Sequence, residues 1–125
     1  MLEIAPGWQV DVDRGPDWLF IKLHSPDHHS GDEPPLADFL WNTLTAHFTY
    51  RVVLEMCDVG MLHSYLVGQL VLLHKRLCTH GGVLRLCGLS DGNQNVLNVC
   101  RLDGRFPQYR DRVEAVHGYH PARPR

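Results

Sequence analysis

The chain has 125 residues, of which 44% are hydrophobic and 21% are charged, and its formal net charge at pH 7 is -2. These values predict one folded domain with an apolar core of its own. So small a net charge disfavours nucleic acid as a direct partner, because proteins that bind nucleic acid concentrate positive charge. We expect residues 1–118 to form the domain and residues 119–125, YHPARPR, to form a short basic tail.

The sequence contains no segment typical of export or of membrane insertion. Residues 1–11 lack the basic start and the apolar middle of a secretory signal, and the longest uncharged apolar run, residues 59–73, is too short to span a bilayer. The four cysteines are far apart and form no C-x-x-C pair, which indicates buried free thiols in a reducing compartment. We therefore expect a cytoplasmic protein without membrane insertion.

Two strands and a helix are predicted in the first part of the chain. Residues 8–12, WQVDV, alternate apolar and polar side chains, RGPD supplies a turn, and residues 18–23, WLFIKL, are aromatic and β-branched, which is typical of a β-hairpin. Residues 24–35, HSPDHHSGDEPP, show no periodicity and are expected to form a surface loop. Apolar residues then recur at helical spacing over residues 35–48, so we expect an amphipathic helix there.

The middle of the chain continues with a strand, a helix and a second strand. Residues 51–57, RVVLEMC, are typical of a buried strand, and the preceding helix suits a crossover between parallel strands. Leucines and valines at helical spacing predict a helix of about four turns over residues 65–80. Gly81 and Gly82 end that helix, and residues 83–89, VLRLCGL, are predicted to form another buried strand.

The last third of the chain is expected to contain two short helices. Ser90 or Asp91 caps the first, RFPQY forms a brief extended segment, and residues 111–118, DRVEAVHG, form a final helical turn or two. The resulting order is β-β-α-β-α-β-α-(β)-α. We therefore predict a single-domain α/β sandwich with about four helices and a mixed sheet of about four to five strands, parallel at its centre.

Ser64 lies where a predicted strand gives way to the long helix, and two interpretations of it are open. As the N-cap residue, its hydroxyl accepts a hydrogen bond from a first-turn backbone N–H, which stabilises a helix by about 1 kcal/mol. Alternatively, it is a phosphorylation site, because the free N–H groups and the positive end of a helix dipole accept a phosphate. A phosphate beside Tyr65, Leu66 and Val67 would end an apolar docking contact.

Residues 51–106, from RVVLEMCDVGMLHSYLVGQL to CRLDGRF, resemble a sulfate transporter and anti-sigma factor antagonist (STAS) domain. Such domains carry a strand, the motif D-S-S/T-G-L-G, a helix, a Gly-Gly pair, a strand, G-x-S and a further helix. The resemblance extends over residues 18–116 and implies the same order of elements as the one predicted above. It implies that Ser64, which matches the first serine of the motif, is phosphorylated by a partner serine kinase that is also the anti-sigma factor.

The motif in this chain departs from the family pattern at several positions. His63 stands in place of the aspartate, Tyr65 in place of the second serine or threonine, and Leu66 in place of the first glycine. Ser64 and Gly68 keep the identity of the motif. The Gly-Glu-Leu-Asp stretch that the family carries after its second strand is also absent, and the histidine-rich loop occupies that place.

The resemblance implies a bacterial protein that binds without catalysis and acts in signal transduction and transcription regulation as an anti-sigma factor antagonist. Its partner would be an anti-sigma factor or serine protein kinase, and a homodimer is compatible with the sequence. The alternative is a constitutive STAS scaffold subunit, in a lipid-transporting ABC system or a stress-signalling assembly, that is not phosphorylated. The expected partner-binding residues are Asp27, His28, His63, Ser64, Tyr65, Leu66, Val67, Leu89 and Ser90.

Metal and enzyme functions are disfavoured by the spacing of the reactive side chains. No C-x-x-C pair accompanies the histidines, and His24, at a turn from strand to loop, is expected to be solvated. No G-x-S-x-G elbow, P-loop or G-x-G-x-x-G motif is present. We therefore expect no metal, no cofactor and no catalytic residue. The side chains with atoms able to bind a metal are His24, Asp27, His28, His29, His74, Cys78 and His80.

Overall fold

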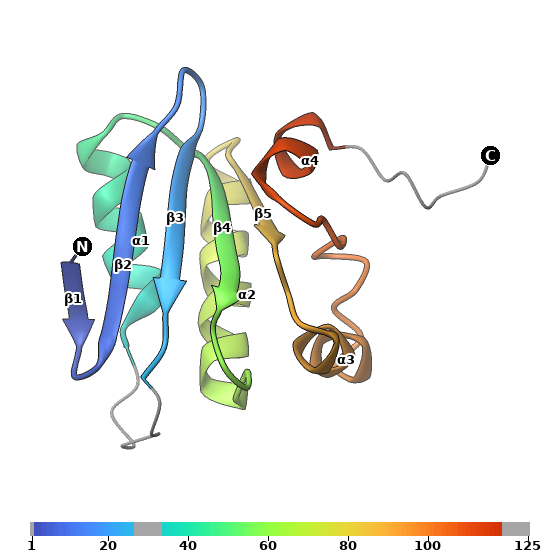
Figure 1. Cartoon of the computed structure of the whole chain (residues 1–125). Helices are drawn as coiled ribbons and strands as arrows, with labels where there is room; N and C mark the ends of the chain where they lie inside the picture. The colour runs from blue at the N-terminus through green and yellow to red at the C-terminus, as the bar shows by residue number, and fades with distance from the viewer. Residues whose placement is uncertain (1, 27–33, 119–125) are drawn as a thin grey trace.

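One mixed β-sheet forms the centre of the molecule (Figure 1). The computed structural model describes residues 2–26 and 34–118. Neighbouring strands follow the chain order β1-β2-β3-β4-β5, antiparallel from β1 to β3 and parallel from β3 to β5, which confirms the predicted mixed sheet. The strands are β1 (Leu2–Ala5), β2 (Trp8–Arg14), β3 (Leu19–His24), β4 (Arg51–Asp58) and β5 (Val83–Cys87).

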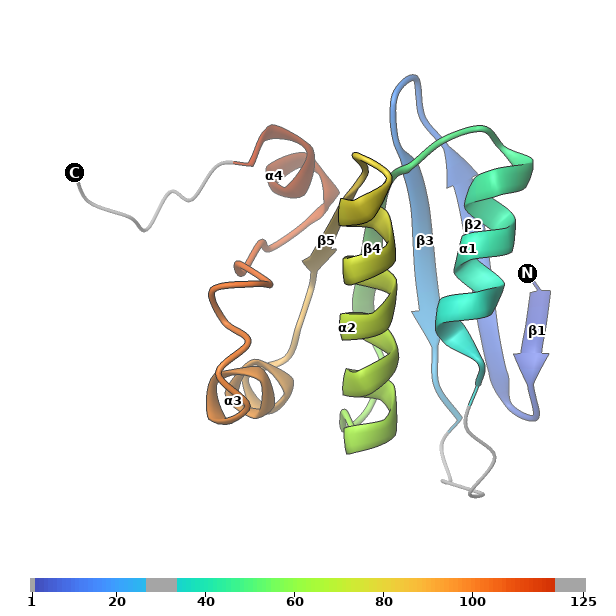
Figure 2. The same ribbon diagram turned by 180° about the vertical axis from the view of Figure 1, so that it is seen from behind.

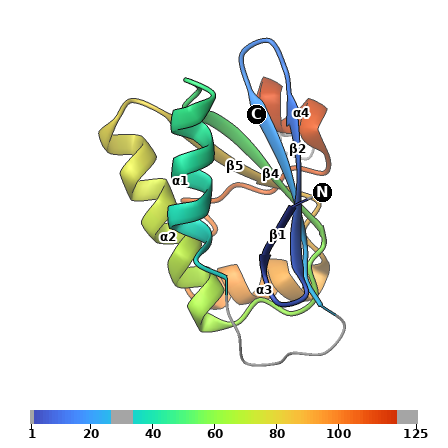
Figure 3. The ribbon, with the colours of Figure 1, turned by 90° about the vertical axis from the view of Figure 1, so that its left-hand side faces the viewer.

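Two helices cover one face of the sheet and a third packs against the other. Figure 2 shows α1 (Leu36–Ala46) and α2 (Ser64–Thr79) side by side in front of the strands, and Figure 3 shows both on the same side. These are the helices of the two parallel crossovers, β3-α1-β4 and β4-α2-β5. The short α4 (Arg112–His117) lies on the far side, and α3 (Asp91–Val99) lies beyond the end of β5 that leads into it.

The core lies between the sheet and the α1–α2 pair, and strand alternation explains why. In β3, every second side chain is buried while the side chains between them are partly exposed, so one face of the strand turns toward the helices. The leucines of α1 and α2 recur every three or four residues and meet that face. The residues concerned include Leu19, Ile21, Leu23, Val52, Leu54, Met56, Leu40, Leu44, Leu70, Leu73 and Leu77.

Two details of the predicted strand order are wrong. Three strands open the fold, because the N-terminal β1 pairs with β2 across a turn in which Gly7 has a φ of 81°. The segment RFPQY forms no strand in the described chain and contributes one isolated bridge, from Tyr109 to Cys87. Pro107 lies inside that segment and has no N–H to donate to a ladder.

The prediction of buried thiols is wrong for three of the four cysteines. Cys87 is buried beneath α4, whereas Cys57, Cys78 and Cys100 are exposed, and all four are free. The exposed ones lie near or beyond the ends of their elements, where strand or helix periodicity no longer implies burial. No helix in the described part of the chain is long and apolar enough to cross a membrane.

Arg112 anchors α4 to the face of the sheet opposite to α1 and α2. Its guanidinium donates hydrogen bonds to Asp13 on β2, at 2.8 Å, and to Glu55 on β4, at 2.5 Å. It also lies 4.3 Å from the centre of the Phe20 ring on β3. One side chain therefore contacts three strands, and it complements the apolar contacts that α4 makes through Ala115.

We expect Arg112→Leu to lower the free energy of unfolding by about 1 kcal/mol, because Glu55 loses a charged donor while solvent screens part of that loss. Urea denaturation would measure the change, with Arg14→Leu, at an exposed arginine near the same hairpin, as the control. Adding Glu55→Gln to Arg112→Leu should restore part of the stability. Equal midpoints for Arg112→Leu and the control would contradict this role.

Candidate functional site

Ser64 is the first residue of α2, at the carboxyl edge of the parallel strands. The N-cap residue is His63, with extended backbone angles, so of the two interpretations of Ser64 the one in which it caps the helix is wrong. No side-chain hydrogen bond caps this end of α2, and no acidic residue lies in its first turn. The Ser64 hydroxyl is exposed at a helix N-terminus whose partial positive charge is not offset by a nearby carboxylate within that turn.

The residues predicted to surround Ser64 divide into an exposed and a buried group. Tyr65 is 43% exposed, His63 is exposed, and Met61, which the sequence did not single out, is 71% exposed. Leu66 and Val67 are 1% and 7% exposed and belong to the core, so they support this surface from beneath and are not presented on it. We call Met61, His63, Ser64 and Tyr65 the α2 entry surface.

The other predicted contact residues lie in two further segments. Asp27 and His28 fall outside the described residues. Leu89 is half-buried against the main core, and Ser90 is exposed as the N-cap of α3, where its Oγ accepts a hydrogen bond from the Asn93 N–H at 3.2 Å. The expectation that Ser90 or Asp91 caps this helix is thus confirmed with Ser90.

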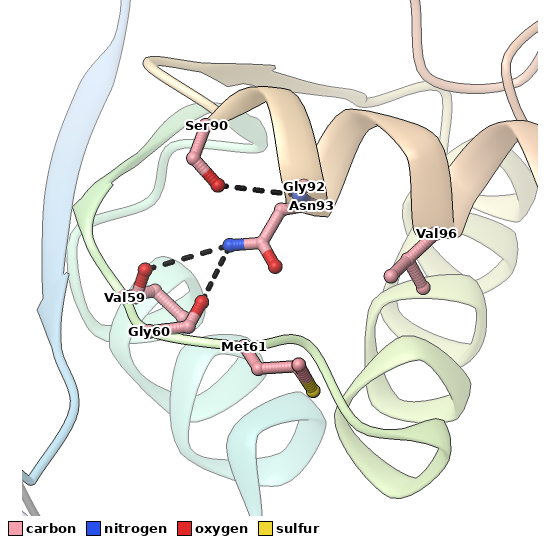
Figure 4. Close-up of a pocket in the computed structure, with 7 residues that line it drawn as sticks. All are labelled: Val59, Gly60, Met61, Ser90, Gly92, Asn93 and Val96. Carbon is pink, nitrogen blue, oxygen red and sulfur yellow. Dashed lines mark hydrogen bonds between the residues drawn. The ribbon is translucent and has the colours of Figure 1, made fainter.

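Asn93 joins α3 to the loop that precedes α2 (Figure 4). Its side chain is 2% exposed, its Oδ1 accepts from the Leu62 N–H at 2.8 Å, and its Nδ2 donates to the Gly60 carbonyl at 2.6 Å and the Val59 carbonyl at 3.4 Å. The carboxamide therefore satisfies backbone groups on both sides of Met61. Sequence reasoning missed Asn93, because a polar residue three positions after a capping serine does not by itself indicate a contact with a distant loop.

The opposite side of the same loop is held from β3. Ser25 Oγ accepts a hydrogen bond from the Gly60 N–H at 2.8 Å, and the Ser25 N–H donates to the Asp58 carbonyl at 3.3 Å. Gly60 is thus bonded through its carbonyl to α3 and through its N–H to the end of β3. The loop that leads to Ser64 is fixed at both edges before a partner arrives.

His24, the last residue of β3, contacts β2 and β4 next to Ser25. Its Nε2 lies 2.9 Å from Asp11 on β2, and its Nδ1 lies 2.8 Å from Asp58 at the end of β4. The prediction of a solvated ring is wrong, because the side chain is only 21% exposed and contacts two carboxylates. The hydrogen bond with His24 lowers the pKa of Asp11 below its ordinary value.

A pocket of about 380 Å³ opens between this loop and α3. Figure 4 shows Asn93 and Ser90 at the α3 side, with the Met61 side chain and Val96 at its apolar end. The pocket adjoins the α2 entry surface through Met61. It is lined by Val59, Gly60, Met61, Ser90, Gly92, Asn93 and Val96.

No family model matches this sequence, and no curated protein sequence is similar to it. Solved structures, in contrast, share its fold. An anti-sigma factor antagonist from Mycobacterium paratuberculosis is 15% identical, with 89% of this chain and 92% of that chain covered and a TM-score of 0.72. RsbS from Moorella thermoacetica, in a variant form, is 12% identical over 88% and 93% of the two chains, with a TM-score of 0.70.

A third similar structure is SpoIIAA, an anti-sigma factor antagonist in its unphosphorylated form. It is 15% identical, 90% of this chain and 98% of that chain are covered, and the TM-score is 0.62. A chain from the stressosome, described as a signal integration and transduction hub, is also similar, with a TM-score of 0.69 at 13% identity over 86% and 94% of the chains. The STAS fold that the sequence resemblance implied is therefore confirmed.

We expect Asn93→Leu to lower the free energy of unfolding by about 2–3 kcal/mol, because the buried Leu62 N–H and Val59 carbonyl lose their partner. Urea denaturation would measure this, and amide hydrogen exchange should show faster exchange at Leu62. Asn95→Leu changes an exposed asparagine of the same helix and serves as the control. A loss no larger than the control's would show that Asn93 does not hold the loop.

Proposed function

We propose that this chain is an anti-sigma factor antagonist that works by docking a partner protein and has no catalytic role. The partner would be an anti-sigma factor that is also a serine kinase. The observation that carries the proposal is the exposed Ser64 at the start of α2, on a loop anchored by Asn93 and Ser25, in a fold shared with anti-sigma factor antagonists.

The proposed docking surface is the α2 entry surface together with the pocket beside Met61. Met61 and Tyr65 supply exposed apolar area, and the pocket offers a cavity into which a partner side chain fits. Ser90 lies on the α3 side of the pocket and extends the surface in that direction. Since the loop is already fixed by buried hydrogen bonds, docking loses little conformational entropy there.

Phosphorylation of Ser64 is proposed as the step that ends docking. A phosphate would carry a charge of about -1.5 to -2 at pH 7 and would lie at the N-terminus of α2, which accepts anions. The helix would tolerate it, whereas an apolar contact at Met61 and Tyr65 would gain a strongly hydrated group at its centre. The modification thus acts on the surface of the domain and not on its folding.

We expect Ser64→Ala to bind the partner as the unmodified chain does and Ser64→Asp to weaken binding by at least about tenfold, because it places a fixed charge at the apolar contact. Binding would be measured by calorimetry against each anti-sigma factor kinase of the source organism. Thr79→Asp adds the same charge at the exposed far end of α2 and should bind normally.

Intact-mass spectrometry of protein from native cells, with fragmentation, then locates any phosphate. Equal binding by Ser64→Asp and Ser64→Ala, with no phosphate at Ser64 under any growth condition, would refute the switch. A partner that still docks on the same surface would then make the chain a constitutive scaffold. Failure of every kinase to bind would refute the anti-sigma factor partner.

Gly68 supplies an independent test of the docking surface. It is exposed in the second turn of α2, one turn after Ser64, and an added Cβ would meet no atom of the described residues within 4 Å. Nothing in that part of the chain therefore requires a glycine there, although glycine in a helix interior costs up to about 1 kcal/mol relative to alanine. A partner that approaches this face closely would explain it.

We expect Gly68→Ala to raise the free energy of unfolding by about 0.5–1 kcal/mol and to weaken partner binding. These opposite signs separate a binding role from a structural one, because a structurally required glycine would destabilise the fold when replaced. Thermal unfolding and the calorimetric assay above give the two readouts. Unchanged partner affinity in the stabilised variant would exclude Gly68 from the interface.

A further inference from the structure

His24 lies between two carboxylates of the neighbouring strands, and its place in the alternation of β3 puts it on the sheet face opposite to α1 and α2. Its Nε2 lies 2.9 Å from Asp11 Oδ2 on β2, and its Nδ1 lies 2.8 Å from Asp58 Oδ2 at the end of β4. From the same strand, Lys22 places its Nζ 3.8 Å from that Asp58 oxygen. The ring is therefore flanked by two anions, one of which is shared with a cation.

An irregularity in the pairing of β3 with β4 brings Asp58 to this position. Lys22, two residues before His24, pairs with Glu55. Regular parallel pairing would then place Cys57 opposite His24, but the register shifts by one residue and Asp58 lies there instead. A shift of one residue turns the side chains of a strand to the other face, and such irregularities often re-aim a side chain next to a functional site. The contact between His24 and Asp58 thus depends on a specific departure from the ladder.

The same end of β3 holds the loop that precedes α2. Ser25, the residue after His24, donates its N–H to the Asp58 carbonyl at 3.3 Å and accepts the Gly60 N–H on its Oγ at 2.8 Å. Asp58 is therefore held twice, by its side chain through His24 and by its backbone through Ser25. The His24 contacts and the anchor of Gly60 are adjacent along the chain, so a change at one reaches the other through a single residue.

The charge of the His24 ring determines whether both carboxylates are attracted to it. A carboxylate only accepts hydrogen bonds, and a neutral imidazole has an N–H on one nitrogen only, so its other nitrogen would present a lone pair to a carboxylate. The imidazolium has an N–H on each nitrogen, and its positive charge attracts both anions without exact alignment. Histidine is the side chain whose charge ordinarily changes between pH 5 and 8. The arrangement around His24 is thus built from groups that respond to pH in that range.

We propose that His24 is a positioning residue that makes the anchoring of the loop before α2 depend on pH. With the ring charged, Asp11 and Asp58 are both drawn to the end of β3, and Ser25 is held where it bonds Gly60. With the ring neutral, one of the two attractions is lost and the loop is anchored less firmly from β3. Docking at the α2 entry surface is then stronger at mildly acidic pH, a consequence that rests on the proposed function, whereas the coupling of His24 to the loop does not.

Two other titratable groups near the loop are distinguished from His24 by range and by position. The hydrogen bond with His24 lowers the pKa of Asp11, so this carboxylate stays charged between pH 5.5 and pH 8, and its contribution is lost only as the pH falls further. His63 is an exposed histidine on the α2 entry surface itself. It serves as the matched control, because it belongs to the same residue type and lies at the other end of the loop.

The test is amide hydrogen exchange at Gly60 in the full-length chain alone, at pH 5.5 and pH 8. The rates are expressed as protection factors, which removes the intrinsic pH dependence of exchange. We expect protection at Gly60 to fall by about threefold to fivefold from pH 5.5 to pH 8, the effect of one partly exposed ion pair. Equal protection at the two pH values would overturn the proposal.

Three variants assign the effect to the proposed contact. His24→Gln carries no charge at either pH, so Gly60 should show at both the low protection of the unmodified chain at pH 8. Asp58→Asn removes the second carboxylate and should likewise abolish the pH dependence, whereas His63→Gln should leave it unchanged. A dependence that survives His24→Gln, or one that disappears in His63→Gln, would refute the role of His24. Since no partner is present, the outcome is independent of whether an anti-sigma factor docks at Ser64.

Discussion

Asn93 bridges α3 to the loop that follows β4, and the α2 entry surface is positioned from that bridge. The loop has no regular hydrogen-bond ladder of its own, so its buried N–H and C=O groups need partners from elsewhere. One carboxamide provides them for Leu62, Gly60 and Val59. Met61 lies between Gly60 and Leu62, whose backbone groups are satisfied by Asn93, and its own side chain is exposed.

The sheet holds the same loop from the side opposite to Asn93. Parallel strands place the ends of β3 and β4 at one edge, where Ser25 bonds to Gly60 and His24 contacts Asp58. Charged and polar groups thus gather at the edge from which crossover loops leave, which is where open α/β sheets usually place their binding residues. The far end of α2 is held differently: its leucines pack against the strands, and Arg76 contacts Asp38 and the Trp41 ring of α1.

Much of the fold was predictable because the signals were local. The spacing of leucines in α1 and α2 and the valine-rich β4 specify helices and a buried strand in any context where a core forms. The edge strand β1 was missed because Leu2–Ala5 is too short to show a period, and only its Pro6-Gly7 turn marked it.

The site was less predictable because its key contacts are distant in sequence. Asn93 bonds to residues more than 30 positions away, and a polar residue in a first helical turn has the same pattern whether it faces solvent or a neighbouring loop. Ser64 and His63 are both polar and adjacent, so the sequence could not determine which of them caps α2. The sequence placed the start of α2 within one residue, and the interpretation of Ser64 as its cap is the one that the structure contradicts.

Burial sorts the departures from the STAS motif into two kinds. Leu66, where the motif has glycine, is directed into the core, so its added bulk contributes to packing and leaves the outer surface unchanged. His63 and Tyr65 are exposed, so they replace a carboxylate and a small hydroxyl with an imidazole and a phenol on either side of Ser64. Specificity is a difference between affinities, and exposed substitutions at a docking surface change that difference without changing the fold. A partner that docks on the proposed surface would therefore meet an imidazole and a phenol beside Ser64.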